Sequence, residues 1–477
     1  FEKLKFSSKN IFSIKIDDSY KITDYGIKSS ISINELIIKK NIDIQNIFPN
    51  FKSQIKLSNH QTEIIYRNGN LSINGNGSFL IQENYDKAYY KIEKVKDYHL
   101  FKIKYDFINN PIKLNFLNYK INDQSEVSIK IDGKINNDKS LNFKKIELKN
   151  SNDSIIIDDL VLTNDFKISE IKSAKFNFTD SQNKKNVFQI EDNKKNYLIS
   201  GKTFNASKFI DDMIFEDSKN KDIFAKDYDI KIDLKEVFLH NDHITYNLKG
   251  GLSSKDNNVI NANITSQFNN NEKMSFTILR KNNQRVTTFF SDQAKPFVQK
   301  FNFIKGFNNG SLDFYSVKSK DISNSKLKIY NFKLKELPAL TKILTLASLQ
   351  GIADLLSGDG IGFSEFEMNF ENKNKLMTIN EIYAIGPAIS ILMEGYIEKS
   401  KLISLRGTLV PATTINKAIG SIPIIGNILV GKKTGEGVFG VSFKIKGPPK
   451  KLETSVNPIK TLTPRFITRT LEKIKKN

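Results

Sequence analysis

The stretch VSIKIDGKI, residues 127–135, alternates apolar and polar side chains and decides the fold prediction. This alternation places Val127, Ile129 and Ile131 on one face of an extended chain. The same period of two recurs up to about residue 335, for example in VINANI (259–264) and MSFTI (274–278). Because such alternation is typical of strands with one apolar and one polar face, we expect a mainly β protein.

The segments between these strands carry the residues that tight turns require. Asn68-Gly69 suits a two-residue type I′ turn. INNDKSLNF (135–143), QFNNNEKMSF (267–276) and HNDH (240–243) indicate further hairpin turns. The sequence therefore predicts a long antiparallel curled sheet that forms an elongated apolar groove, although a closed sandwich of two sheets fits the same pattern.

An open apolar face of this length would need a ligand or partner to cover it. The residues predicted to line the groove are Val127, Ile129, Ile131, Ile260, Ile264, Met274, Phe276 and Ile278.

Helical patterns are few and short, and they are concentrated toward the C-terminal end. Two short helices are predicted within 204–215 and 291–301, and a nearly all-apolar helix from Pro338 to Leu356. A second apolar insertion covers 411–431, and residues 463–476 predict a basic tail helix. No run is long enough to span a bilayer, which takes ~20 apolar residues.

The C-terminal apolar segments have two interpretations. They could meet a bilayer surface, or they could plug the end of the groove as ordinary core. The membrane-contact candidates are Leu346, Leu349, Ile422, Ile424, Ile425, Leu429, Arg465, Phe466 and Arg469.

Composition narrows the range of functions. The formal net charge of +21 suits a solvated surface and a polyanionic partner about equally, and that partner could be nucleic acid or an anionic membrane surface. The chain has no Cys, which excludes disulfides and thiolate chemistry. It has no Trp and its basic residues are dispersed, so we expect no nucleic-acid partner.

Motifs for catalysis or cofactor binding are weak. GNILVGKKT (426–434) approaches a phosphate-binding loop, but Lys433 stands where a Ser or Thr is needed and a strand pattern follows. The chain has only four His, and the paired acids Asp158-Asp159 are assigned to a turn. We therefore expect a protein that is not an enzyme and that uses no cofactor and no metal.

Several stretches resemble the AsmA-like family, in particular its YhdP-type C-terminal region in alphaproteobacteria. The resemblance is strong from about Ile199 to the end, whereas earlier residues share only the strand pattern. The stretches that carry it are ISGKTFNASKFI (199–210), SDQAKPFVQKFNFIKGFNNGSLDF (291–314), LPALTKILTLASLQGIADLLSGDGIGFSEFE (337–367), AIGPAISILMEGYI (384–397), LRGTLVPATTIN (405–416), IPIIGNILVG (422–431) and VSFKIKGPPKKLETSVNPIKTLTPRF (441–466).

The resemblance implies a periplasmic β-groove that carries phospholipid from the inner toward the outer membrane and supports outer-membrane biogenesis, without a cofactor. It also implies an inner-membrane anchor upstream of this fragment and outer-membrane contact at the C-terminal end. The expected divisions are 1–200 (N-terminal groove), 201–336 (middle groove) and 337–477 (C-terminal module). The alternative is a non-catalytic scaffold or assembly factor for outer-membrane proteins, whose strands would pair with the groove edge.

Overall fold

The computed structural model groups the chain into two compact units, Phe1–Asn258 and Val259–Asn477. We call them the N-terminal unit and the C-terminal unit. The residues that the structure describes are 2–39, 45, 47–108, 110–121, 126–210, 224–240, 243–256, 258–298, 306–335, 338–346, 358–399, 401–411, 441–449 and 451–457.

The N-terminal unit consists almost entirely of strands. Its elements are β1 (Lys3–Ile16), β2 (Ile22–Lys39), β3 (Gln54–Arg67), β4 (Asn70–Leu80), β5 (Tyr85–Val95), β6 (Tyr98–Phe107), β7 (Ile112–Leu114), η1 (Asn115–Leu117), β8 (Tyr119–Ile121), β9 (Val127–Asn136), β10 (Leu141–Lys149), β11 (Ser154–Leu162), β12 (Ile168–Thr179), β13 (Lys185–Asp192), β14 (Tyr197–Asn205), β15 (Tyr228–His240) and β16 (His243–Lys255).

In its described residues, the C-terminal unit combines strands with two short helices. Its elements are β17 (Asn258–Gln267), β18 (Lys273–Lys281), β19 (Gln284–Ser291), α2 (Lys295–Val298), β20 (Asn308–Ser319), β21 (Ile322–Leu334), α3 (Pro338–Leu346), β22 (Ile361–Lys373), β23 (Leu376–Ile385), β24 (Ile389–Glu398), β25 (Leu402–Pro411), β26 (Val441–Gly447) and β27 (Glu453–Asn457).

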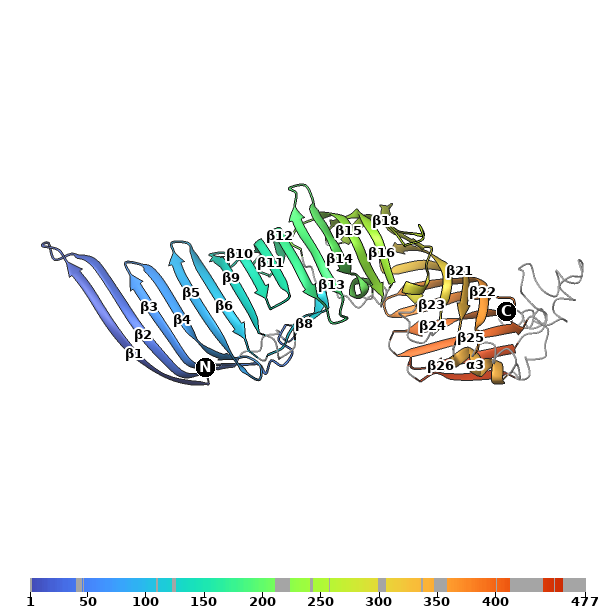
Figure 1. Ribbon diagram of the computed structural model, residues 1–477, viewed down its shortest axis with the longest axis horizontal. Coiled ribbons are helices and arrows are strands. Elements are labelled where there is room, and N and C mark those ends of the chain that lie inside the picture. Colours follow the sequence, from blue (N-terminus) through green and yellow to red (C-terminus); the bar gives the residue numbers. More distant parts are fainter. Residues whose placement is uncertain are drawn as a thin grey trace, which may run out of the picture. The chain divides into compact units, whose positions relative to one another are not determined.

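The main sheet follows the order of the chain. Among the described residues it contains 25 strands, and β7 and β8 form a separate two-stranded sheet. Strands β1 to β6 and β9 to β16 lie side by side in sequence order in Figure 1. The predicted mainly β fold with a long, curled, antiparallel sheet is confirmed.

One parallel pair departs from the antiparallel pattern. Strand β14 pairs with β15 in parallel, with Ile199 opposite Ile232. A parallel pair needs a longer crossover than a hairpin, and residues 206–227 supply it. This connection includes a helical turn at 207–210, within the helix predicted for 204–215.

Asparagine turns connect the strands as the sequence indicates. Asn68 and Gly69 both have positive φ, 46° and 84°, and form a two-residue link between β3 and β4. Asn282 and Asn283 do the same between β18 and β19. Asn tolerates this region because its side chain hydrogen-bonds locally.

The prediction that Asp158 and Asp159 lie in a turn is wrong. Both residues lie inside strand β11, not in a turn. Asp159 has a positive φ of 48°, and its carboxylate lies 3.2 Å from the Lys172 ammonium. The distortion at Asp159 interrupts the apolar–polar alternation of β11. For this reason the two adjacent acids resemble a strand boundary in the sequence.

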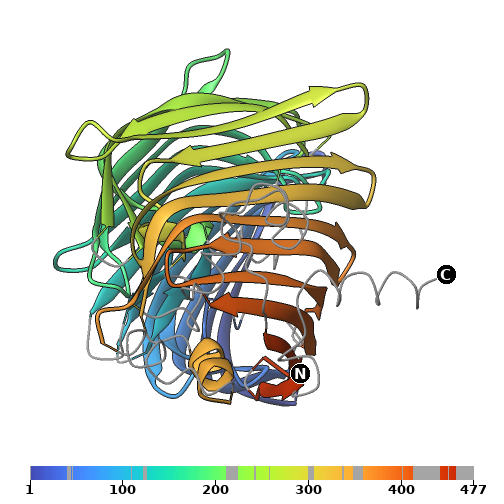
Figure 2. The ribbon, with the colours of Figure 1, turned by 90° about the vertical axis from the view of Figure 1, so that its right-hand side faces the viewer.

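The two labelled helices fall within predicted segments. Helix α2 lies inside 291–301, and α3 begins at Pro338 as expected, with 347–357 outside the described residues. Helix α3 packs beside β27, the last described strand. Figure 2 shows β27 at the red end of the curved C-terminal sheet. None of the helices in the described ranges is long and apolar enough to cross a bilayer.

Candidate functional site

The register of the N-terminal unit places apolar side chains in unbroken rows across the strands. Residues directly opposite each other in neighbouring strands share one face of a sheet. One row crosses every strand of the main sheet from β6 to β15. Its members are Ile103, Ile131, Ile146, Ile157, Ala174, Ile190, Ile199 and Ile232.

The C-terminal unit has an equivalent row. It runs through every strand from β17 to β27, with one glycine among the apolar side chains. Its members are Ile264, Phe276, Phe289, Phe314, Leu327, Met368, Ile382, Met393, Gly407, Phe443 and Val456. We call the face that carries these rows the apolar face and the opposite face the polar face.

Most side chains in these rows are only half-buried. Ile103, Ile131 and Ile146 keep part of their surface exposed, as do Phe276 and Phe314 in the C-terminal unit. A packed second sheet would remove nearly all of that surface from water, because protein interiors are close-packed. The rows therefore combine strong apolar character with incomplete cover.

The eight predicted groove residues all belong to the apolar face. Ile129 and Ile131 lie opposite Leu148 and Ile146, and Ile264 lies opposite Phe276. Their burial differs. The half-buried members are Ile129, Ile131, Ile260, Ile264 and Phe276, and the buried members are Val127, Met274 and Ile278.

Protein atoms cover parts of the apolar face, and two such contacts illustrate this. At the end of β9, Val127 is buried beside Phe107, whose ring stacks on Phe48 at 5.8 Å between centroids. In the C-terminal unit, Phe297 of α2 packs edge-on against Phe289 at 4.7 Å. Within each unit these contacts cover a section of the face, and most row members away from them stay half-exposed.

Glycines let aromatic rings lie flat on the apolar face. A Cβ atom at Gly75 would lie 2.2 Å from the ring of Tyr90, on the neighbouring strand. A Cβ atom at Gly133 would lie 2.8 Å from Cζ of Phe101. Because a flat ring occupies less height above the sheet than an upright one, these pairs add apolar area without filling the space above the sheet.

A buried polar cluster holds one end of strands β5 and β6. The Asp86 carboxylate accepts hydrogen bonds from the Ile108 backbone N–H (2.6 Å), the Asn110 amide (2.8 Å) and the Tyr105 hydroxyl (3.1 Å). Burial raises the pKa of Asp86, and the three donors oppose this rise only in part. The cluster connects the strand ends to the segment that leads into β7.

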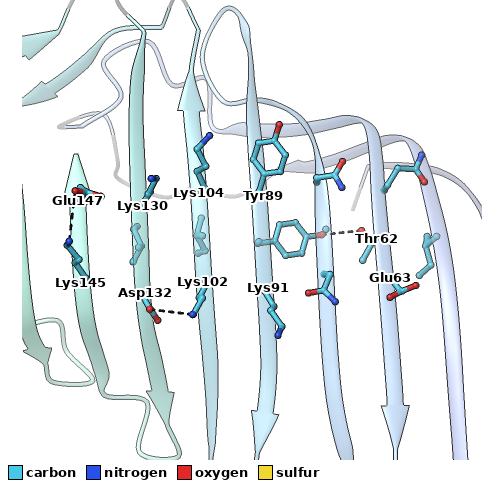
Figure 3. Close-up of a pocket in the computed structure, with 18 of the residues that line it drawn as sticks. Thr62, Glu63, Tyr89, Lys91, Lys102, Lys104, Lys130, Asp132, Lys145 and Glu147 are labelled. Atoms are coloured by element: carbon cyan, nitrogen blue, oxygen red, sulfur yellow. Dashed lines mark hydrogen bonds and ion pairs between the residues drawn. The ribbon is translucent and has the colours of Figure 1, made fainter. Parts of the chain in front are cut away.

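The polar face carries a shallow hollow of about 750 Å³ across β2 to β6, β9 and β10. Figure 3 shows Lys102 beside Asp132 and Lys145 beside Glu147, at 3.8 and 4.0 Å. On the apolar face behind the hollow, the Tyr90 and Thr62 hydroxyls share a hydrogen bond of 3.1 Å. Lys91 and Lys104, which also line the hollow, pair with Glu93 and Asp106 just outside it, so acids neutralise most of its lysines.

The membrane-contact candidates are described only in part. Leu346, at the end of α3, is 52% exposed, whereas Leu340, Ile343 and Leu344 of the same helix are buried. One face of α3 is therefore core, and Leu346 lies away from it. The other candidates, Leu349, Ile422, Ile424, Ile425, Leu429, Arg465, Phe466 and Arg469, lie outside the described residues.

Sequence reasoning missed a group of cations on the apolar face. Arg280 lies opposite Arg285 across the β18–β19 hairpin, and Arg285 lies opposite Lys318 of β20. The signal was present in RKNNQR (280–285), because a two-residue turn at Asn282-Asn283 brings the flanking arginines together. The histidines of HNDH are likewise register partners, His240 opposite His243, which confirms a hairpin there.

A scan against protein-family models found no match to this chain, and a search of curated proteins also found none. The candidate site is therefore defined by its own geometry, namely two long apolar rows with incomplete cover and a cationic group at one end of three strands.

Proposed function

We propose that this protein carries phospholipid along its apolar face, between the inner and outer membranes of a Gram-negative cell envelope. Transport would be non-catalytic and would support outer-membrane biogenesis. The observation that carries the proposal is the continuity of the half-buried apolar rows, from β6 to β15 and from β17 to β27.

The energetic reason is the cost of moving lipid tails through water. Exposing a methylene group costs ~0.8 kcal/mol, so an acyl chain of about fifteen methylenes would cost ~12 kcal/mol. A track that offers apolar side chains on every strand lowers this cost at each step. The sequence resemblance to the AsmA-like family supports the same assignment.

The test is site-specific photocrosslinking of the full chain, made in a Gram-negative host, with a benzophenone amino acid. Position 146, on the apolar face of β10, is compared with position 145, on the polar face of the same strand. We expect a phospholipid adduct by mass spectrometry at 146 and none at 145. Equal labelling at both positions, or no phospholipid at 146, would overturn the proposal.

A scaffold for outer-membrane proteins is the second candidate, and strand β1 favours it. Within the described ranges β1 pairs only with β2, and its side chains are exposed throughout, with Phe12 at 69% and Ile14 at 64%. An unpaired edge of this kind can receive another strand. Crosslinking to client proteins from position 12, with phospholipid absent from position 146, would favour this function instead.

A further inference from the structure

Three cations lie together on the apolar face at one end of β18, β19 and β20. Arg280 and Arg285 are register partners, and so are Arg285 and Lys318. By alternation they follow Ile278, Thr287 and Ser316 on the same face. Three long basic side chains thus occupy adjacent positions beside a surface that is otherwise apolar.

This arrangement costs energy unless an anion is present. Like charges directly opposite each other in a sheet are destabilising. None of the three forms a salt bridge with any described residue. Arg285 is half-buried, and its Nε atom is buried without a hydrogen-bond partner among the described residues. A buried guanidinium donor without an acceptor points to a missing partner with negative oxygens.

The residues next to the cations change character in steps along the strands. Two positions inward lie the hydroxyls of Thr287, Ser316 and Ser325, with Ser316 and Ser325 hydrogen-bonded at 2.8 Å. Two positions further inward lie the rings of Phe289 and Phe314. Each step is roughly 7 Å, since a strand rises ~3.4 Å per residue. Charge, hydroxyl and ring therefore succeed one another over about 14 Å.

A phospholipid has the same sequence of chemistry, from phosphate through glycerol esters to acyl chain. We propose that Arg280, Arg285 and Lys318 form a head-group site for anionic phospholipid, with the phosphate at the cations and the acyl chains over Phe289 and Phe314. This inference rests on the proposed transport function and adds a preferred class of cargo. Arginine is suited to this role because its planar donors match phosphate oxygens in pairs.

The experiment compares three forms of the full chain. The test variant carries Arg280→Gln, Arg285→Gln and Lys318→Gln. The matched control carries Lys281→Gln, Lys444→Gln and Lys446→Gln, which removes the same charge from exposed positions on the polar face. Each protein is titrated calorimetrically with dihexanoyl phosphatidylglycerol, dihexanoyl phosphatidylcholine and inorganic phosphate.

We expect the test variant to bind phosphatidylglycerol about tenfold more weakly than the wild type and the control, with a smaller change for phosphatidylcholine. Equal binding of phosphatidylglycerol by all three proteins would overturn the head-group site and leave the transport function intact. Tight binding of inorganic phosphate, without phosphatidylglycerol, would show a site for a free anion and overturn the lipid assignment. Absence of lipid binding in the wild type would overturn the transport function itself.

Discussion

The substitution Ile131→Asp distinguishes an apolar face that is open to water from one that is buried in a closed core. Ile131 lies in the row between Ile103 and Ile146 and is half-buried. Full burial of an isoleucine is worth about 1.5–3 kcal/mol, so losing half of it costs ~1 kcal/mol. On a face that keeps contact with water the new carboxylate stays hydrated, and we expect a total loss of about 1–2 kcal/mol.

A closed core would give a different magnitude. An unpaired carboxylate buried between two packed layers would cost more than about 4 kcal/mol, in the range of the most damaging single substitutions. The appropriate measurement is hydrogen exchange by mass spectrometry, which reports the opening free energy of β6, β9 and β10 locally. Lipid extraction of the same protein reports whether phospholipid is still bound.

Lys130→Ser provides the matched control, because Lys130 is the exposed neighbour on the polar face of the same strand. It should leave exchange and bound lipid within error of the wild type. For Ile131→Asp we expect modestly faster exchange together with loss of bound phospholipid. A local loss above 4 kcal/mol, or unchanged phospholipid, would show that the reasoning about an open face is wrong.

Three further predictions concern polar side chains of strands β5, β22 and β3. Asp86→Ala leaves the donors of Ile108, Asn110 and Tyr105 without an acceptor. Hydrogen exchange should therefore show that the opening free energy of β5 and β6 falls by about 2–3 kcal/mol. A fall below about 1 kcal/mol would contradict the assigned hydrogen bonds. Burial alone would raise the pKa of Glu367, but hydrogen bonds from Asn369, Lys328 and Lys326 outweigh it and lower the pKa to about 2. The Glu367 carboxylate therefore stabilises the fold fully above pH 4.5, and this stabilisation is lost as the pH falls through about 2. Glu367→Gln should destabilise β22 by about 2 kcal/mol at pH 7 and hardly at all at pH 2, as measured by hydrogen exchange at each pH. Burial lowers the pKa of His60 from 6.5. The contribution of the neutral imidazole to folding stability is therefore full above pH 6.5 and is lost as the pH falls through the lowered pKa. A His60→Phe variant should lack this acid-induced loss of stability in thermal unfolding profiles.

The fold was largely predictable because the signal for each strand is local. Alternation identified strands such as 127–136, and Asn68-Gly69 identified a hairpin, since both depend on neighbouring residues only. The parallel pairing of β14 with β15 depends instead on a partner that lies a 22-residue connection (206–227) further along the chain. Nothing in the alternation of 197–205 distinguishes a parallel from an antiparallel partner.

The candidate site was predictable in kind but not in detail. Alternation placed Ile131 and Phe276 on an apolar face, yet the continuity of the rows depends on the register of every hairpin. Arg285 and Lys318 lie opposite each other on β19 and β20. These strands are separated in the chain by sixteen residues, 292–307, which include α2, so no short motif could reveal the pair. Cover by Phe297 on Phe289 likewise arises from this connection.

The chain-order pairing of the strands has a consequence for how such a protein changes over evolution. Inner strands such as β2, β3 and β4 bond to the strand before and the strand after them in the chain, as in repeat architectures where neighbours supply most of the stability. Gain or loss of a whole hairpin alters reach by about 10 Å, since adjacent strands are ~4.8 Å apart, while every other pairing is kept. Selection can therefore lengthen or shorten the sheet within a unit without redesigning the remaining strands.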